Sequence, residues 1–199
     1  MAHDGLWEQL EQLDHNETAR RAKCKYLNER NCYMIKLLNT EYFVRLSDRS
    51  IYSDHVDVQK RPATFLEQLC LLAYLINAKD LPLAGKLVVA ESLPGGQFFF
   101  RGLHRLPTEK LEKTFGNCPE ALFEITAGFH AGRCEFGDAS ISLNVLPRVP
   151  LTIVIWRRCE EFNARASVLF DQTAASQLPL DALLTAVNLT VEALISKCG

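Results

Sequence analysis

Residues 151–156 (LTIVIW) constrain the fold more than any other stretch, because they are apolar on both faces of an extended chain. A strand that buries both faces belongs in the interior of a sheet. The preceding segment, ASISLNV, alternates apolar and polar residues, and ARASVLFD follows after an acidic turn. We therefore predict a C-terminal antiparallel meander of three strands, at residues 140–145, 151–156 and 166–170.

The rest of the chain mixes strand and helix patterns irregularly, which favours an α+β fold with a mostly antiparallel sheet packed by several helices. Alternation in CYMIKLL and EYFVRLS predicts a hairpin turning at Asn39, and residues 47–61 are predicted as a loop with one short strand at 50–52. Pro62 and Pro179 are predicted to open two apolar helices. Further predicted elements are a strand at 86–90 and helices at 107–115 and 119–129.

Length and composition predict one globular domain spanning residues 1–199, since 199 residues bury one sizeable core. The 22 basic and 24 acidic residues leave a net charge of −2, so nucleic-acid binding is not expected. Because no signal sequence or long apolar run occurs, we expect a cytoplasmic protein without membrane insertion. Seven scattered cysteines without a CxxC pair predict free thiols and no structural disulfide.

The sequence contains no clear motif for a nucleotide site, a metal site or a catalytic nucleophile. Neither G-x-G-x-x-G nor G-x-x-x-x-G-K-[ST] occurs, and no serine lies in a G-x-S-x-G context. Asp54, His55 and Asp57 are interpreted as a polar loop, and His130 with Cys134 lacks the paired close ligands of a zinc site. No metal site is therefore predicted.

Residues 91–107 (ESLPGGQFFFRGLHRLP) form the candidate binding segment. On a strand, Phe98 and Phe100 would face one way and Phe99 the other, so a core strand buried on both sides is one interpretation. In the other interpretation the aromatic residues line a cleft for a flat, partly anionic ligand. Arg101 or Arg105 would then meet a carboxylate.

His104 would supply hydrogen bonding or axial ligation in that cleft, and a tetrapyrrole, either a corrinoid or haem, is the cofactor class considered. Arg148, Arg157 and Arg158 flank the meander and either close such a cleft or solvate the turns. The predicted site residues are Gly95, Gly96, Phe98, Phe100, Arg101, His104, Arg105 and Arg157.

PRVPLTIVIWRRCEEFNARASVLFD, together with LPGGQFFF and FGNCPEALFE, resembles the DUF3786 family of bacterial and archaeal proteins, and the resemblance runs on to QLPLDALLTAVNLTVEALI. That family has no assigned activity. Some of its members resemble fusions with a four-cysteine iron–sulfur segment, which implies a setting in anaerobic redox or corrinoid-linked metabolism. The scattered cysteines of this chain depart from that form, so the resemblance implies an iron–sulfur or corrinoid protein as partner rather than an intrinsic cluster.

Two functions stay open at this point. The first is a non-catalytic accessory protein that binds a cofactor or a partner beside GGQFFF. The alternative is a small enzyme whose acid/base site is assembled from separate segments, with His104, Asp138 and Arg157 as acid, base and anion-binding group.

Overall fold

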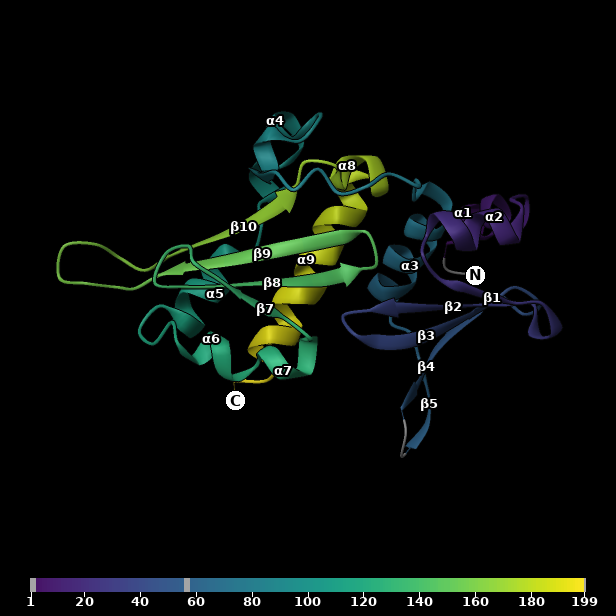
Figure 1. Ribbon diagram of the computed structural model, residues 1–199, viewed down its shortest axis with the longest axis horizontal. Coiled ribbons are helices and arrows are strands. Elements are labelled where there is room, and N and C mark those ends of the chain that lie inside the picture. Colours follow the sequence, from purple (N-terminus) through teal and green to yellow (C-terminus); the bar gives the residue numbers. More distant parts are fainter. Residues whose placement is uncertain (1–2, 56–57, 199) are drawn as a thin grey trace.

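Two antiparallel sheets organise the computed structural model, which describes residues 3–55 and 58–198, with only the main chain described at 54, 55 and 58–60 (Figure 1). The first sheet has the order β1-β2-β3-β4-β5, with β1 Lys25–Leu27, β2 Cys32–Leu37, β3 Thr40–Arg45, β4 Ser50–His55 and β5 Val58–Pro62. The second has the order β6-β10-β9-β8-β7, with β6 Leu87–Val89, β7 Gly132–Cys134, β8 Ala139–Leu146, β9 Val149–Trp156 and β10 Arg165–Asp171.

Helices pack against both sheets, which confirms the predicted α+β class. They are α1 Asp4–Glu11, α2 His15–Arg21, α3 Phe65–Asn77, α4 Gly96–Phe99, α5 Thr108–Phe115, α6 Ala121–Glu124, α7 Thr126–Phe129, α8 Ala174–Gln177 and α9 Leu180–Ile195. Short 3₁₀ turns lie at η1 Asn28–Arg30, η2 Ala90–Ser92 and η3 Gly102–His104. Helix α9 runs along the second sheet and contacts α3, which packs beside the first sheet (Figure 1). One contiguous apolar core joins these layers.

The predicted meander is confirmed, with β9 between β8 and β10. Ile153 lies opposite Ile141 on one side and Val168 on the other. Residues on both faces of β9 are buried, including Ile153 and its neighbours Thr152 and Val154. The two-sided apolar pattern thus identifies the central strand, because both of its faces are removed from water.

The predicted hairpin is also confirmed, and the short strand predicted at 50–52 lies within β4, but the loop predicted around it was wrong because β4 runs on to His55 and β5 follows. β4 pairs with β3 and β5, and Ser53 lies opposite Arg61 before an irregularity near His55. Its buried positions are Ile51 and Ser53, so the strand shows no run of apolar side chains. Pairing to β3 and β5 therefore extends the strand beyond the three residues that the sequence predicted.

The start of α3 was also predicted wrongly, because Pro62 ends β5 instead of opening a helix. Thr64 is the N-cap, and a capping box joins its side chain and main chain to Glu67. The last helix, by contrast, begins directly after Pro179, as predicted.

The strand considered for the GGQFFF segment is wrong: this stretch forms the single turn α4 followed by η3. Gly95 has φ 76°, a left-handed conformation that suits glycine. A Cβ on Gly96 would overlap the carbonyl oxygen of Ala90, so this turn packs closely on η2. The predicted helix at 119–129 is divided into α6 and α7.

Arg148, in the turn between β8 and β9, joins the two halves of the molecule and is only 6% exposed. It therefore neither closes a cleft beside GGQFFF nor solvates its turn. Its guanidinium donates to the carbonyl oxygens of Arg21 and Leu81 and pairs with Asp80. Nearby, the main chain of the first hairpin donates a hydrogen bond to β8, which brings the two sheets together beside a pocket.

Candidate functional site

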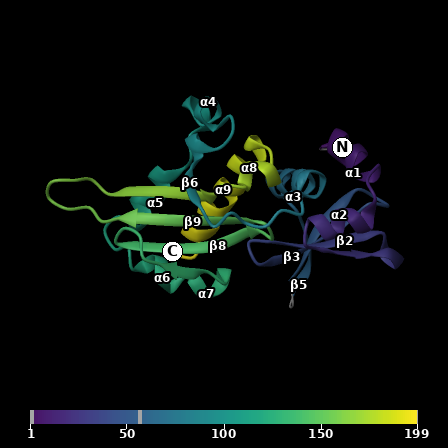
Figure 2. The same cartoon turned by 45° about the horizontal axis from the view of Figure 1, so that its top comes forward.

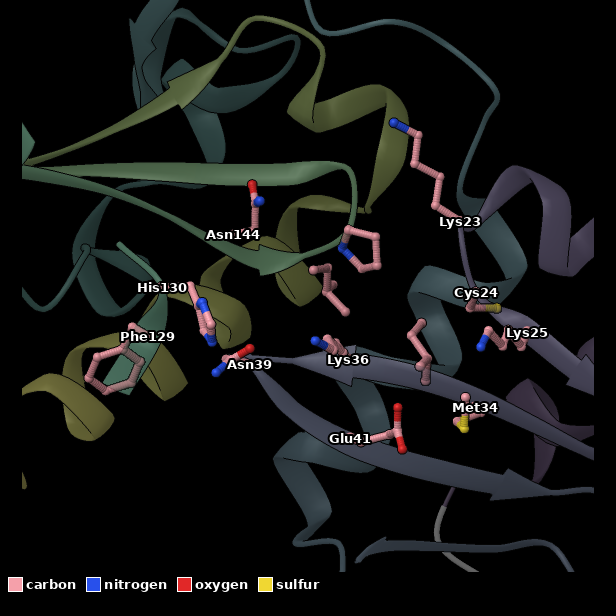
Figure 3. A pocket seen from close by; sticks show the side chains of 13 residues that line it. Lys23, Cys24, Lys25, Met34, Lys36, Asn39, Glu41, Phe129, His130 and Asn144 are labelled. Carbon is pink, nitrogen blue, oxygen red and sulfur yellow. The ribbon is translucent and has the colours of Figure 1, made fainter. Parts of the chain in front are cut away.

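A pocket of about 530 Å³ lies between the two sheets, where the first hairpin approaches α7 and the end of β8 (Figure 3). Its lining residues come from the α2–β1 connection, β1, β2, the β2–β3 turn, β3, the end of α7, β8 and the β8–β9 turn: Lys23, Cys24, Lys25, Met34, Ile35, Lys36, Asn39, Glu41, Phe129, His130, Asn144, Leu146 and Pro147. Its volume is in the usual range for a small-molecule site. We call it the intersheet pocket.

The hairpin turn shapes one side of this pocket. Leu38 and Asn39 both have positive φ, as a two-residue turn between twisted strands requires. The Leu38 N–H donates to the carbonyl oxygen of Val145 at 3.0 Å, which ties the turn to β8. In Figure 3 the Asn39 amide, the His130 ring and the Lys36 ammonium lie on the same side of the hollow.

The rim of the pocket is cationic and its floor is apolar. Lys23, Lys25 and Lys36 are exposed, and within the described residues none of them forms an ion pair. Glu41 is the acidic member of the lining, so the three lysines leave a charge of +2 on a chain whose net charge is −2. Ile35, Phe129 and Leu146, in contrast, are buried. This arrangement attracts a ligand that has an anionic group and an apolar body.

Two of the residues that line the pocket, Lys23 and His130, occupy left-handed backbone positions at helix ends. Lys23 has φ 48° just after α2, and His130 has φ 49° just after α7. In each case a main-chain bond closes the helix end, from Cys24 to Ala19 at 3.0 Å and from Ala131 to Thr126 at 3.1 Å. Glycine is the usual residue at such positions, because a side chain there strains the backbone. Strained non-glycine residues are characteristic of functional sites.

The pocket does not bring together a nucleophile and a base. Burial raises the pKa of the Cys24 thiol to about 12, so this thiol stays protonated at neutral pH. Within the described residues the His130 ring has no hydrogen-bond partner that would orient it as a base.

A family model described as "Domain of unknown function (DUF3786)" matches residues 14–193. The chain belongs to the DUF3786 family. No curated protein and no solved structure gives a significant match. Within the described residues of this DUF3786 chain, no helix combines the length and apolarity needed to cross a membrane.

Residues 91–107, the binding segment predicted from the sequence of this DUF3786 protein, do not belong to the intersheet pocket. They lie beside a second cavity of about 660 Å³ between η2, α5 and β10. Phe100 and Arg105 line that cavity, and Phe100 is also buried in the core. Phe98 is 74% exposed with Arg101 over its ring, and His104 stacks on Phe99 at 4.5 Å. The other predicted residues, Gly95, Gly96, Phe98, Arg101, His104 and Arg157, do not line this cavity.

The acid/base trio of the enzyme hypothesis is not assembled. The Asp138 carboxylate accepts a hydrogen bond from the Arg157 main chain at 2.7 Å, and the Arg157 guanidinium pairs with Glu120. His104 instead stacks on Phe99, and no hydrogen bond or ring contact of the described residues joins it to the other two.

Metal ligands are not gathered either, since no group of three potential ligand side chains occurs among the described residues. The side chains of Asp54, His55 and Asp57, which the sequence analysis considered, lie outside the described residues.

Sequence reasoning missed most of the intersheet pocket and considered His130 only as a metal ligand. One signal was available: Lys23 follows an obvious helix where glycine is expected, and lysines flank Cys24. No sequence pattern indicated that Lys36 and Asn144 lie near Lys23 and Cys24, because Lys36 and Asn144 belong to strands of two different sheets.

Proposed function

We propose that this DUF3786 protein is a non-catalytic binding protein that holds a small anionic ligand in the intersheet pocket. The observation that carries the proposal is the set of three lysines over an apolar floor, none of which pairs with an acidic side chain in the part of the chain that the structure describes. Each lysine is a flexible point charge that can meet a carboxylate or a phosphate, and Phe129 offers apolar contact. Among the described residues of the pocket, the Cys24 thiol is protonated at neutral pH and no hydrogen bond orients the His130 ring as a base, so neither is activated for acyl or group transfer.

Within this proposal the ligand is a cofactor of anaerobic redox or corrinoid-linked metabolism, and the protein is an accessory in the cytoplasm. Support for that setting comes from the family resemblance. A haem or corrinoid is the cofactor class considered, because Lys23 and Lys36 would meet its carboxylate or phosphate groups while Met34 and Phe129 contact its ring. Bound there, such a group would supply redox or alkyl-transfer chemistry to a partner.

A titration with defined probes tests this function. Haemin, cobalamin, citrate and inorganic phosphate are titrated into the purified protein under anaerobic conditions, with absorption spectra and calorimetry as readouts. We expect at least one probe to bind, and Lys23→Gln/Lys36→Gln to weaken that binding by roughly tenfold or more. Lys113→Gln, which changes an exposed lysine of α5 outside the pocket, is the matched control. Lack of binding by every probe, or equal affinity of the pocket variant and the control, would contradict the proposal.

A partner protein, namely an iron–sulfur or corrinoid protein, belongs to the same proposal and would dock at α4 and η3. Phe98 is 74% exposed and Leu103 is fully exposed, beside Arg101 and Arg105, which form no ion pair within the described residues. Exposed apolar side chains rimmed by charge are typical of protein interfaces. Arg101→Ala/Arg105→Ala should weaken association with such a partner and change the free energy of unfolding by less than about 1 kcal/mol.

A further inference from the structure

One end of the intersheet pocket, at the β2–β3 turn, gathers three polar side chains. They are Lys36 of β2, Asn39 of the turn and His130, which follows α7. Figures 1 and 2 both show the tip of this hairpin beside the second sheet and α7. Within the part of the chain that the structure describes, none of the three side chains forms a hydrogen bond, an ion pair or a ring contact. We call this part of the pocket its turn end.

The direction of Lys36 shows that this side chain serves the pocket rather than its own sheet. In the register it lies opposite Glu41, and opposite charges at such positions commonly pair. Both side chains are described, yet no ion pair joins them. In Figure 3 the Lys36 ammonium instead points toward Asn39 and His130. An ammonium, an amide and an imidazole therefore share one part of the pocket, and an anion there would accept from all three.

The types of these groups favour one class of anion. A planar carboxylate is typically held by the paired N–H groups of an arginine, whereas lysine binds phosphate as a point charge. Arginine is absent from the lining in the described part of the chain. The three donors come from a strand, a turn and the residue after a helix, so they approach a bound group from different directions. Three separate donors suit the three terminal oxygens of a tetrahedral phosphate.

The main chain holds two of these donors in place. The Leu38 N–H donates to the carbonyl oxygen of Val145 at 3.0 Å, which ties the turn that carries Asn39 to β8. A main-chain bond likewise closes the end of α7 around His130. Both Asn39 and His130 have positive φ, so the backbone directs each side chain from a defined position. Donors fixed in this way lose little freedom when a ligand binds.

We propose that the turn end binds the phosphate of a phosphate monoester, with Lys36, Asn39 and His130 each donating to a terminal oxygen. Asn39 donates through its carboxamide nitrogen, and His130 through a ring N–H. The rest of the ligand lies over the apolar floor, which includes the buried side chains of Ile35 and Leu146. This inference rests on the function proposed above and narrows its ligand from any small anion to a phosphorylated molecule.

Titrations with phenyl phosphate, benzoate and phthalate, followed by NMR chemical shifts of the protein, test the inference. The probes share one aromatic ring, and phthalate matches the double negative charge of phenyl phosphate with two planar carboxylates. We expect phenyl phosphate to bind roughly tenfold more tightly than either carboxylate. Equal or tighter binding of phthalate would overturn the inference but leave the proposed anion binding in place. So would failure of all three probes when citrate, haemin or cobalamin binds, whereas failure of every probe would contradict both proposals.

Two variants locate the phosphate. His130→Asn keeps a residue type that tolerates positive φ but removes the ring donor, and Asn39→Asp keeps the turn but sets a negative charge against the phosphate. Each should weaken phenyl phosphate binding by roughly fivefold or more, with unchanged circular dichroism. His104→Asn makes the same substitution at an exposed histidine outside the pocket and is the matched control. Wild-type affinity in both pocket variants, or an equal loss in the control, would overturn the inference.

Discussion

The Nε of Arg148 donates a hydrogen bond to the carbonyl oxygen of Arg21 at 2.6 Å, across 127 residues of sequence. Arg21 ends α2, whereas Arg148 lies between two strands of the second sheet. The same guanidinium reaches Leu81 and Asp80, so one buried side chain holds three segments together. This contact fixes the α2 end from which Lys23 enters the intersheet pocket.

Replacing Arg148 should therefore destabilise the protein strongly. Arg148→Met keeps the apolar stem but leaves buried carbonyl oxygens without donors, and we expect a loss of about 2–4 kcal/mol in the free energy of unfolding. Urea denaturation measures it. Arg158→Met, at an exposed residue of the β9–β10 loop, is the control and should change stability by less than about 0.5 kcal/mol. Equal effects of the two changes would show that Arg148 is not an anchor.

The substitution Lys23→Gly should lower the ligand affinity of the intersheet pocket while leaving the stability of the protein almost unchanged. Glycine removes the backbone strain at φ 48° but adds freedom to the unfolded chain, so the free energy of unfolding should stay within about 1 kcal/mol of the wild type. Ligand affinity should fall because a cation leaves the rim. Lys25→Gly, in the extended strand β1, gains no such relief and should lose more stability. Thermal unfolding gives the comparison, and a strongly destabilised Lys23→Gly would contradict the account of strain.

Glu67 should make stability depend on pH in the acid range. Burial alone would raise the pKa of this carboxyl, but hydrogen bonds from Arg61, Tyr42 and the Thr64 main chain outweigh it and hold the pKa below its ordinary value of 4.5. Its contribution is therefore present above that ordinary value and is lost as pH falls through the lower folded-state pKa. We expect Glu67→Gln to cost about 1–3 kcal/mol near neutral pH.

The destabilisation caused by Glu67→Gln should shrink toward zero as pH falls below the lowered folded-state pKa of this carboxyl, because the wild-type side chain is then protonated as well. Urea unfolding at a series of pH values measures the difference. Glu109→Gln, at an exposed residue of α5, should show no comparable dependence. A difference that stays constant across the acid range would refute the role assigned to the charged carboxylate.

The seven cysteines are free thiols in the structure, and they should fall into distinct reactivity classes. Cys118 and Cys159 are exposed and should be alkylated first. Burial raises the pKa of Cys70 to about 12, so its thiol should react only after unfolding, and Cys24 should be slow for the same reason. Timed alkylation with mass spectrometry orders the sites. A stable bridged pair, or early labelling of Cys70, would contradict this prediction.

Local patterns in the sequence were enough to predict those elements whose burial can be inferred from their own residues. Residues 151–156 are apolar on both faces, so the central strand was predictable. The C-terminal helix after Pro179 was equally clear. In each case the burial or cap of the element follows from residues within a few positions of one another.

Only the tertiary structure decided the features that join distant segments. β4 extends past the predicted residues 50–52 because β3 and β5 pair with it, Arg148 is buried because carbonyl oxygens from two other segments surround it, and Phe98 lies at the surface because the turn at Gly95 and Gly96 packs on η2. The intersheet pocket has the same origin, because its walls come from both sheets and α7. The sequence by itself determined the periodic elements, since periodicity records burial along one segment. Contacts between segments depend on how those elements pack, and that packing placed the lysines of the pocket around one cavity.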